Sequence, residues 1–463
     1  MIEDLKPYEE YKETGLPWLG KVPGHWEVLP NRALFSEVKD RDHPDEEMLS
    51  VTITKGIVKQ KALLESSSKK DSSNHDKSAY KLVQPCDIAY NKMRAWQGAI
   101  GVSTLRGIIS PAYVVMRLRK ANNLPNYFHY LCRTTQFAKE AERWSYGITS
   151  DMWSLRPEHF KMIYTSVPPP AEQAAIVHFL DWANGRLERA IRAKRKVIAL
   201  LNEQKQAIIH CAVTRGLDPS VPLRPSGIPW LGDIPAHWDI RRAKYLFREV
   251  DERSMDGSEE LLSVSHLTGI TPRSQKNITM FKAASYVAHK VCKPGDLVVN
   301  TMWAWMGALG VSTHTGIISP AYAVYRPLNY NRIVGDYMDN VLRTKPYLSN
   351  IICRSTGLRA SRLRLYPDEF FRLEIIQPPH DEQLKIVESI QVETADLDTA
   401  ISRLEGEINL LREYRTRLVS DVVTGKLDVR DAATRLPDED LLPDLPAADD
   451  EPDDMPIEEE GDS

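Results

Sequence analysis

The sequence contains two copies of one domain-sized module. Short motifs of its first half return in its second half at a nearly constant spacing. These motifs are Gly15–Gly20 and Gly227–Gly232, Val22–Trp26 and Ile234–Trp238, Gly107–Tyr113 and Gly316–Tyr322, and Pro168–Gln173 and Pro378–Gln383. The spacing far exceeds the roughly 20–50 residues of a solenoid repeat. It therefore indicates tandem duplication of a whole module, which suits a target that also has two related halves.

The composition is that of an ordinary globular protein, with 42% hydrophobic and 27% charged residues among 463. No apolar run reaches the roughly 18 residues of a membrane span, and the first residues lack the apolar core of a signal peptide. The five cysteines are scattered and never form a CxxC pair. These features predict a cytoplasmic protein without disulfides, a zinc site or a membrane partner.

The net charge of −4 conceals an uneven distribution. No basic residue follows Arg435, whereas thirteen acidic residues lie between Asp438 and Asp462. Without this tail, 60 basic residues face 51 acidic ones, a net charge of +9. We expect the tail (431–463) to be disordered, acting as a solubilising segment or as a DNA mimic or partner contact. The mildly basic remainder suits local contacts with nucleic acid.

Each copy is predicted to end in a long helix, over residues 171–213 and 381–423, where there is no proline and only one glycine each. Apolar residues recur at alternating steps of four and three, which is typical of a coiled-coil seam. We expect the two helices to pair antiparallel, although each could instead pack on its own domain. Three seam positions carry cations that we predict to mark a partner-binding surface: Lys194, Lys205 and Arg415.

The first part of each copy is predicted to be a mixed domain. Glycines separate short β-like runs, which are Asp87–Tyr90, Ala99–Val102, Ile108–Ser110 and Val114–Leu118, with counterparts Asp296–Asn300, Ala308–Val311 and Ala323–Tyr325. A helical stretch is expected near Tyr127–Trp144. Stretches that are kept between the copies are interpreted as scaffold. Stretches that differ are where two copies could recognise two different sequences.

The differing stretches are rich in residues that bind DNA, although any single one could be an ordinary surface residue. Arginine and lysine can contact phosphates or the guanine edge, and short polar residues can contact either. The predicted DNA-binding residues are Lys55, Lys92, Arg94, Tyr146, Thr149, Ser150, His266, Trp303, Arg354, Thr356, Arg359, Arg362 and Arg364. Trp96 and Trp305 are instead expected to pack within the loops.

These motifs, in this order and in two copies, resemble the specificity (S) subunit of type I restriction-modification systems. The resemblance includes the endings Val213–Leu217 and Val423–Leu427 and leaves out only the acidic tail. It implies an α+β chain in which a long antiparallel two-helix coiled coil separates two target-recognition domains. The implied boundaries are 1–170 and 226–379 for the domains, 171–225 and 380–430 for the helices, and 431–463 for the tail.

The resemblance also implies a non-catalytic subunit that binds double-stranded DNA with a bipartite site. Its implied partners are two methyltransferase subunits that use S-adenosylmethionine, and restriction subunits that use ATP and Mg. Consistent with this, the sequence shows no nucleotide-binding, methyltransferase or metal motif, so we predict neither catalytic nor metal-binding residues and no cofactor. Two alternatives remain, a stand-alone enzyme such as a nuclease and a DNA-binding scaffold or anti-restriction protein without methyltransferase partners.

Overall fold

The computed structural model describes residues 5–65, 76–147, 153–266, 268–275, 285–357 and 363–436. The chain divides into two compact units. Unit 1 joins the residues up to Lys194 with those from Gly406 onward, and unit 2 is built on Arg195–Glu405. Each unit therefore combines one copy of the module with part of both long helices. The tail predicted to be disordered over 431–463 lies outside the described residues from position 437 onward, but its beginning is ordered, because Ala433 is buried in the core of unit 1.

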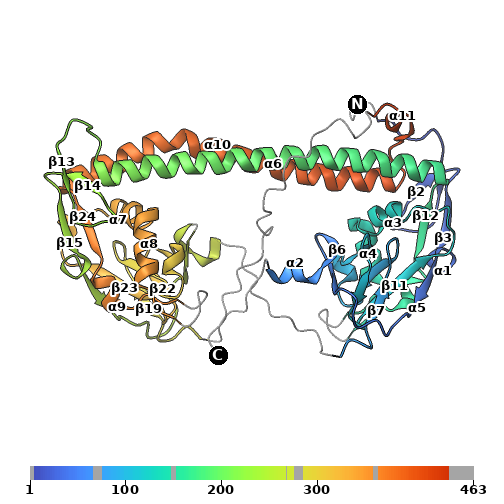
Figure 1. Cartoon of the computed structure of the whole chain (residues 1–463), viewed down its shortest axis with the longest axis horizontal. Helices are drawn as coiled ribbons and strands as arrows, with labels where there is room; N and C mark the ends of the chain where they lie inside the picture. The colour runs from blue at the N-terminus through green and yellow to red at the C-terminus, as the bar shows by residue number, and fades with distance from the viewer. Residues whose placement is uncertain are drawn as a thin grey trace. The chain divides into compact units, whose positions relative to one another are not determined.

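The two long helices are present where the apolar periodicity predicts them, as α6 (Pro170–Arg215) and α10 (His380–Val423). Within unit 1 they are antiparallel, because Glu188 pairs with Arg415 while Lys194, further along α6, pairs with the earlier residue Glu407. Within unit 2, Ile209 of α6 shares a core with Ile386 of α10. Residues of both helices thus contribute to the core of each unit; α6 and α10 are the two long helices labelled in Figure 1.

The strands of each copy form small antiparallel sheets. In unit 1 the strands are β1 (Tyr11–Glu13), β2 (Lys21–Pro23), β3 (Glu27–Pro30), β4 (Phe35–Val38), β5 (Leu49–Thr52), β6 (Gly56–Lys59), β7 (Lys81–Val83), β8 (Ile88–Asn91), β9 (Ile100–Val102), β10 (Gly107–Ile109), β11 (Tyr113–Leu118) and β12 (Tyr164–Val167). In unit 2 they are β13 (Leu223–Pro225), β14 (Asp233–Pro235), β15 (Asp239–Arg242), β16 (Phe247–Val250), β17 (Leu262–Ser265), β18 (Gly269–Pro272), β19 (Lys290–Cys292), β20 (Leu297–Val299), β21 (Leu309–Val311), β22 (Gly316–Ile318), β23 (Ala323–Pro327) and β24 (Glu374–Gln377).

The largest sheet has the same order in both copies, β4-β11-β8-β9 in unit 1 and β16-β23-β20-β21 in unit 2. The predicted runs between 87 and 118, and their counterparts, are all strands, so this part of the prediction is confirmed. The motif that repeats letter for letter contains Gly107, where an added Cβ would lie 2.4 Å from the carbonyl oxygen of Glu47. At Gly316 the same atom would lie 2.5 Å from the carbonyl of Glu260. Close backbone approach therefore requires glycine in both copies.

Short helices complete each copy. They are α1 (Asn31–Leu34), α2 (Gln60–Glu65), α3 (Pro125–Cys132), α4 (Thr135–Arg143), α5 (Pro157–Phe160) and η1 (Ala95–Gln97) in the first, and α7 (Gly335–Leu342), α8 (Lys345–Arg354), α9 (Pro367–Phe371), η3 (Ala243–Tyr245), η4 (Arg273–Gln275), η5 (Ala304–Met306) and η6 (Tyr330–Arg332) in the second; α11 (Arg430–Ala433) follows α10. The helical stretch predicted near Tyr127–Trp144 is present as two helices, α3 and α4. Thr134 interrupts it, because its side chain accepts the backbone N–H of Phe137 and begins a new helix.

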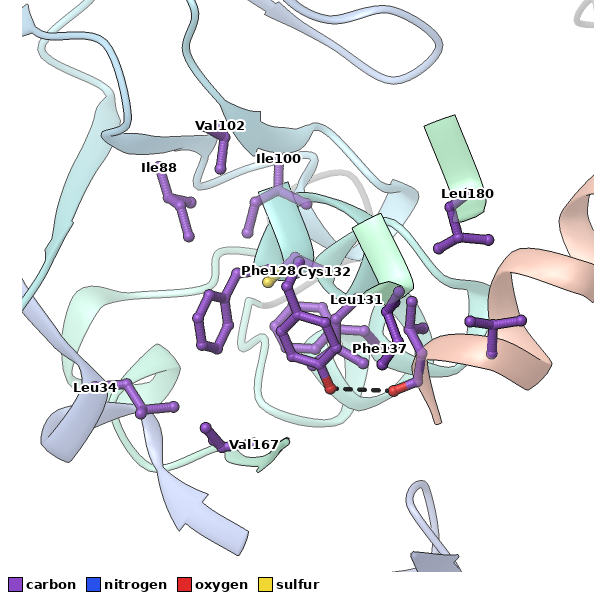
Figure 2. Close-up of a cluster of buried hydrophobic side chains, with 14 of the residues drawn as sticks. Leu34, Ile88, Ile100, Val102, Phe128, Leu131, Cys132, Phe137, Val167 and Leu180 are labelled. Atoms are coloured by element: carbon purple, nitrogen blue, oxygen red, sulfur yellow. Dashed lines mark hydrogen bonds between the residues drawn. The ribbon is translucent and has the colours of Figure 1, made fainter. Parts of the chain in front are cut away.

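Each unit has its own apolar core, which both long helices help to build. In unit 1, Phe128, Leu131 and Phe137 of α3 and α4 are fully buried together with Leu180 of α6 (Figure 2). Val423, at the end of α10, belongs to the same core, and its carbonyl accepts the hydroxyl of Tyr127. The mixed domain of unit 1 is thus fixed to the beginning of one long helix and the end of the other.

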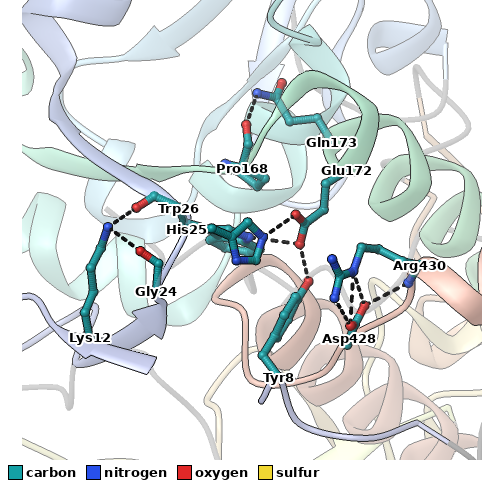
Figure 3. A network of polar contacts seen from close by, with 10 residues as sticks. All are labelled: Tyr8, Lys12, Gly24, His25, Trp26, Pro168, Glu172, Gln173, Asp428 and Arg430. Carbon is teal, nitrogen blue, oxygen red and sulfur yellow. Dashed lines mark hydrogen bonds and ion pairs between the residues drawn. The ribbon is translucent and has the colours of Figure 1, made fainter. Parts of the chain in front are cut away.

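A carboxylate near the start of each long helix explains two of the repeated motifs, and Figure 3 shows the one in unit 1. Glu172 accepts hydrogen bonds from Trp26 Nε1 at 2.9 Å and from Tyr8 at 2.5 Å, and lies 2.7 Å from His25 Nε2. In unit 2, Glu382 lies 3.0 Å from Trp238 Nε1 and 2.7 Å from His237 Nε2. The Pro-x-His-Trp and Glu-Gln motifs are therefore scaffold, as their repetition predicts.

Candidate nucleic-acid interface

The loop after β8 has the same backbone frame as the loop after β20. Asn91 Oδ1 accepts the N–H of Met93 at 3.0 Å, and Asn300 Oδ1 accepts that of Met302 at 3.2 Å. The indole of Trp96 donates to the Met93 carbonyl, and that of Trp305 to the Met302 carbonyl. Both tryptophans therefore hold their loops in shape, which confirms the expectation that they pack within them.

A second shared frame lies between α4 and α5 in unit 1, and between α8 and α9 in unit 2. Tyr146 and Ser154 exchange backbone hydrogen bonds of 3.4 and 3.1 Å, and Thr356 and Arg364 exchange equivalent ones of 3.0 and 2.9 Å. The next residue, Leu155 or Leu365, is buried. It donates its N–H to the carbonyl of the first frame, at Lys92 in unit 1 and at Thr301 in unit 2. The two frames are thus joined in the same way in both copies.

In unit 1 the joined frames enclose an open, polar groove of ≈ 670 Å³, which we name the Lys92 groove. Its lining residues are Lys92, Tyr146, Gly147, Ser154, Arg156, Pro157 and Glu158. Tyr146 is 58% exposed and lies edge-on against the ring of His159. Neither Lys92 nor Arg156 makes an ion pair with any residue in the described part of the chain. Their charges therefore stay available to a ligand.

The charge of the groove residue Lys92 acts on Lys81. The pKa of Lys81 is lowered mainly by its burial and, to a smaller extent, by repulsion from Lys92. Arg41 and Lys39 also repel Lys81, while Glu37 favours its charged form.

Lys55 and His266 occupy equivalent turns, which one arginine holds in each unit. Arg133 donates to the carbonyls of Ile53, Thr54 and Ile100. Its counterpart Arg343 donates to the carbonyl of His266. Lys55 is exposed but is not among the residues that line the Lys92 groove.

The remaining predicted residues are placed as follows. Arg94 is exposed in the loop after β8, and Trp303 stacks on Trp305 with ring centroids 6.4 Å apart. Arg354 is held within unit 2 by Asn350 at 2.7 Å and Glu369 at 3.4 Å. Thr149, Ser150, Arg359 and Arg362 lie outside the described residues. A DNA-binding role stays a prediction for all of the named side chains.

The three seam cations pair with acids of the facing helix in the same unit. Lys194 lies 2.5 Å from Glu407, Lys205 lies 2.5 Å from Asp398, and Arg415 lies 3.1 Å from Glu188. The last two pairs are equivalent, since the repeat aligns Lys205 with Arg415 and Glu188 with Asp398. The pairs explain how the seams accommodate charge, and a role in partner binding stays a prediction.

With Ser154, Arg156 is a groove residue that the sequence prediction missed. It immediately precedes Pro157 at the start of α5, so it reads as an ordinary helix boundary. A comparison of the two copies could have found it, because its counterpart is Tyr366 whereas the adjacent residues are Leu-x-Pro in both copies. Among the described residues there is no cluster of three or more His, Cys, Asp or Glu suited to a metal ion. The described part of the chain also contains no helix that could cross a membrane.

No family model matches the sequence, and no curated protein matches it. Similar solved structures include a chain from work on the structural basis underlying complex assembly and conformational transition of the type I R-M system, with 15% identity, a TM-score of 0.59, and coverage of 88% of this chain and 99% of that one. Others are the HsdS subunit from Thermoanaerobacter tengcongensis (17% identity, TM-score 0.39, 89% and 97% coverage) and the type I restriction-modification S subunit from M. genitalium (12%, 0.33, 90% and 98%). The expected mixed α/β fold, shared with the type I R-M chain, is thereby confirmed.

Proposed function

We propose that this chain is the DNA-specificity subunit of a type I restriction-modification complex. Each unit binds one half of a bipartite double-stranded target. Helices α6 and α10 act as an antiparallel coiled coil that sets the distance between the two halves. The chain itself carries out no reaction. It directs adenine methylation by two methyltransferase subunits that use S-adenosylmethionine, and cleavage by restriction subunits that use ATP and Mg.

One observation carries this proposal: two copies of the same backbone frame present different polar side chains. The backbone frames around Lys92 and Thr301 have the same hydrogen bonds but carry side chains of different chemical type. A duplicated catalytic site would keep its reacting side chains in both copies. Two domains that recognise different DNA sequences would instead keep the backbone frame and differ in the side chains that contact DNA. Two observations support DNA as the ligand: Lys92 and Arg156 form no ion pair among the described residues, and the fold is shared with the type I R-M chain.

The test is reconstitution. The purified chain alone should transfer no methyl group from labelled S-adenosylmethionine to DNA. The methyltransferase encoded beside it should methylate a bipartite motif only when the chain is present. Sequence-specific DNA binding without any effect on a methyltransferase would instead favour the stand-alone scaffold, and methylation or cleavage by the chain alone would favour an enzyme.

A further inference from the structure

We propose that four equivalent positions in each unit are the base-reading positions of this protein, and that the Lys92 groove recognises the acceptor edge of a guanine. The positions are 92, 146, 154 and 156 in unit 1, and 301, 356, 364 and 366 in unit 2. The proposal rests on the proposed function, because it identifies which residues give each unit its own half-site.

The first argument is the constancy of the frame around these positions. Residues 92, 146 and 154 are fixed by backbone hydrogen bonds that recur in unit 2 with lengths within about half an ångström. Ser145 and Ser355, just before the second position, each donate the hydroxyl to a carbonyl of the preceding helix at 2.7 Å. The buried leucine between the third and fourth positions is also kept. The backbone at these positions is therefore held in the same way in both units.

The second argument is that all four side chains differ. Unit 1 carries Lys92, Tyr146, Ser154 and Arg156, and unit 2 carries Thr301, Thr356, Arg364 and Tyr366. The tyrosine is at the second position in unit 1 and at the fourth in unit 2. The arginine is at the fourth position in unit 1 and at the third in unit 2. In contrast, the acid Glu158 at the edge of the groove keeps its charge as Asp368. The four positions thus differ in chemistry while the acid beside them is kept.

The third argument separates base contacts from phosphate contacts. Phosphates are the same in every DNA sequence, so two units that read different half-sites on one scaffold have no reason to exchange their phosphate-binding residues. Kept cations can also be structural, because Lys81 and Lys290 are buried and Lys290 pairs with Asp251. The side chains exchanged at the four positions fit the base-reading role.

The chemistry of the Lys92 groove points to guanine. Lys92 and Arg156 can only donate hydrogen bonds, and the guanine O6 and N7 atoms are two adjacent acceptors in the major groove. Unit 2 offers a different set, because Thr301 is buried and its hydroxyl already donates to the carbonyl of Ala321 at 3.1 Å. Arg364 is then the one cation at its four positions, so unit 2 reads a different base in a different place.

The test transfers the side chains of the second unit to two positions of the first, in the variant Lys92→Thr with Arg156→Tyr. The full chain is co-expressed with its methyltransferase in a host lacking other adenine methylation, and single-molecule sequencing maps the methylated motif. The matched control, Lys120→Thr with Lys139→Thr, removes two exposed cations from the same unit outside the groove. We expect the preference for guanine at one position of one half-site to fall about tenfold or more, since a good bidentate contact contributes roughly 1–3 kcal/mol. The other half-site and the control should be unchanged.

Three results would overturn the inference. An unchanged motif would remove the base-reading role. A uniform loss of methylation at all sequences, with a shallower salt dependence, would assign the cations to phosphates. A wild-type complex without a bipartite motif would remove the proposed function itself. If the variant methylates nothing, competition binding by the same complex with single-base-substituted duplexes decides: lost discrimination at one half supports the inference, and retained discrimination at every position overturns it.

Discussion

Removal of the buried carboxylate should destabilise unit 1 more than unit 2. The variants are Glu172→Ala and its counterpart Glu382→Ala. Glu172 has a side-chain exposure of 5% and binds three side chains, whereas Glu382 is 25% exposed and binds two. The difference arises because the equivalent of Tyr8 in unit 2 is Ser220, whose N–H and hydroxyl both donate to Asp218 instead.

The expected magnitude follows from the buried donors that each variant leaves unsatisfied. An unsatisfied buried donor costs roughly 1–3 kcal/mol, and more when its partner was charged. Glu172→Ala leaves the buried Tyr8 hydroxyl and Trp26 indole without an acceptor, which costs about 4 kcal/mol. Glu382→Ala leaves only the Trp238 indole, which costs about 2 kcal/mol. The two histidines are partly exposed and can be hydrated, so they add little.

Hydrogen exchange resolved by unit is the appropriate assay, because a two-unit chain does not unfold in a single step. Exchange through opening of unit 1 should accelerate by roughly a thousandfold in Glu172→Ala, and that of unit 2 by about thirtyfold in Glu382→Ala, at 1.36 kcal/mol per factor of ten. The variant Tyr8→Phe should account for much of the difference. Equal acceleration in the two variants, or a larger effect in unit 2, would refute this reasoning.

Three other outcomes can be measured. Burial lowers the pKa of His129 to about 4, so on acidification the unfolded state binds a proton before the folded state does. Unit 1 should therefore lose stability as the pH falls from about 6.5 towards 4. Urea unfolding of His129→Asn, which keeps an acceptor for the N–H of Val102, should lack this pH-dependent loss. Exchanging the charges of Lys205 and Asp398 should lower the free energy of unfolding by less than about 1 kcal/mol, while reversing the charge of Lys205 alone should lower it by more, as measured by the same urea unfolding. Inserting four residues near Glu203 should move one unit by about 6 Å and lengthen the methylated motif's spacer by one to two base pairs; an unchanged spacer would contradict the ruler role of the helices.

The scaffold could be predicted from the sequence because its signals are local and occur twice. Proline-free segments with a heptad seam predict both long helices, and glycine-separated runs predict the strands of the main sheets. The break at Thr134 could not be predicted by periodicity alone, since Phe137 and Ala141 continue an apolar face across it. It required recognition of a capping threonine in the middle of a helical pattern.

The interface was only partly predictable, because it depends on which loops meet in space. Lys92 and Tyr146 lie far apart in the sequence, and one backbone hydrogen bond from Leu155 brings their loops together. Arg156 joins the groove through that same contact, so its place could not be seen without the fold. Conversely, Lys55 carries the right chemistry but belongs to a separate turn, held by Arg133.

The most direct test of the account is a chain in which both units are the same. Residues 227–379 are replaced by residues 15–169, and the methylated motif of the complex is mapped as before. If each unit reads one half-site and the helices pair antiparallel, the new target consists of two copies of the unit 1 half-site in inverted orientation, separated by the original spacer. A motif that keeps both original half-sites would contradict the central claim that the two units are separate readers of a bipartite sequence.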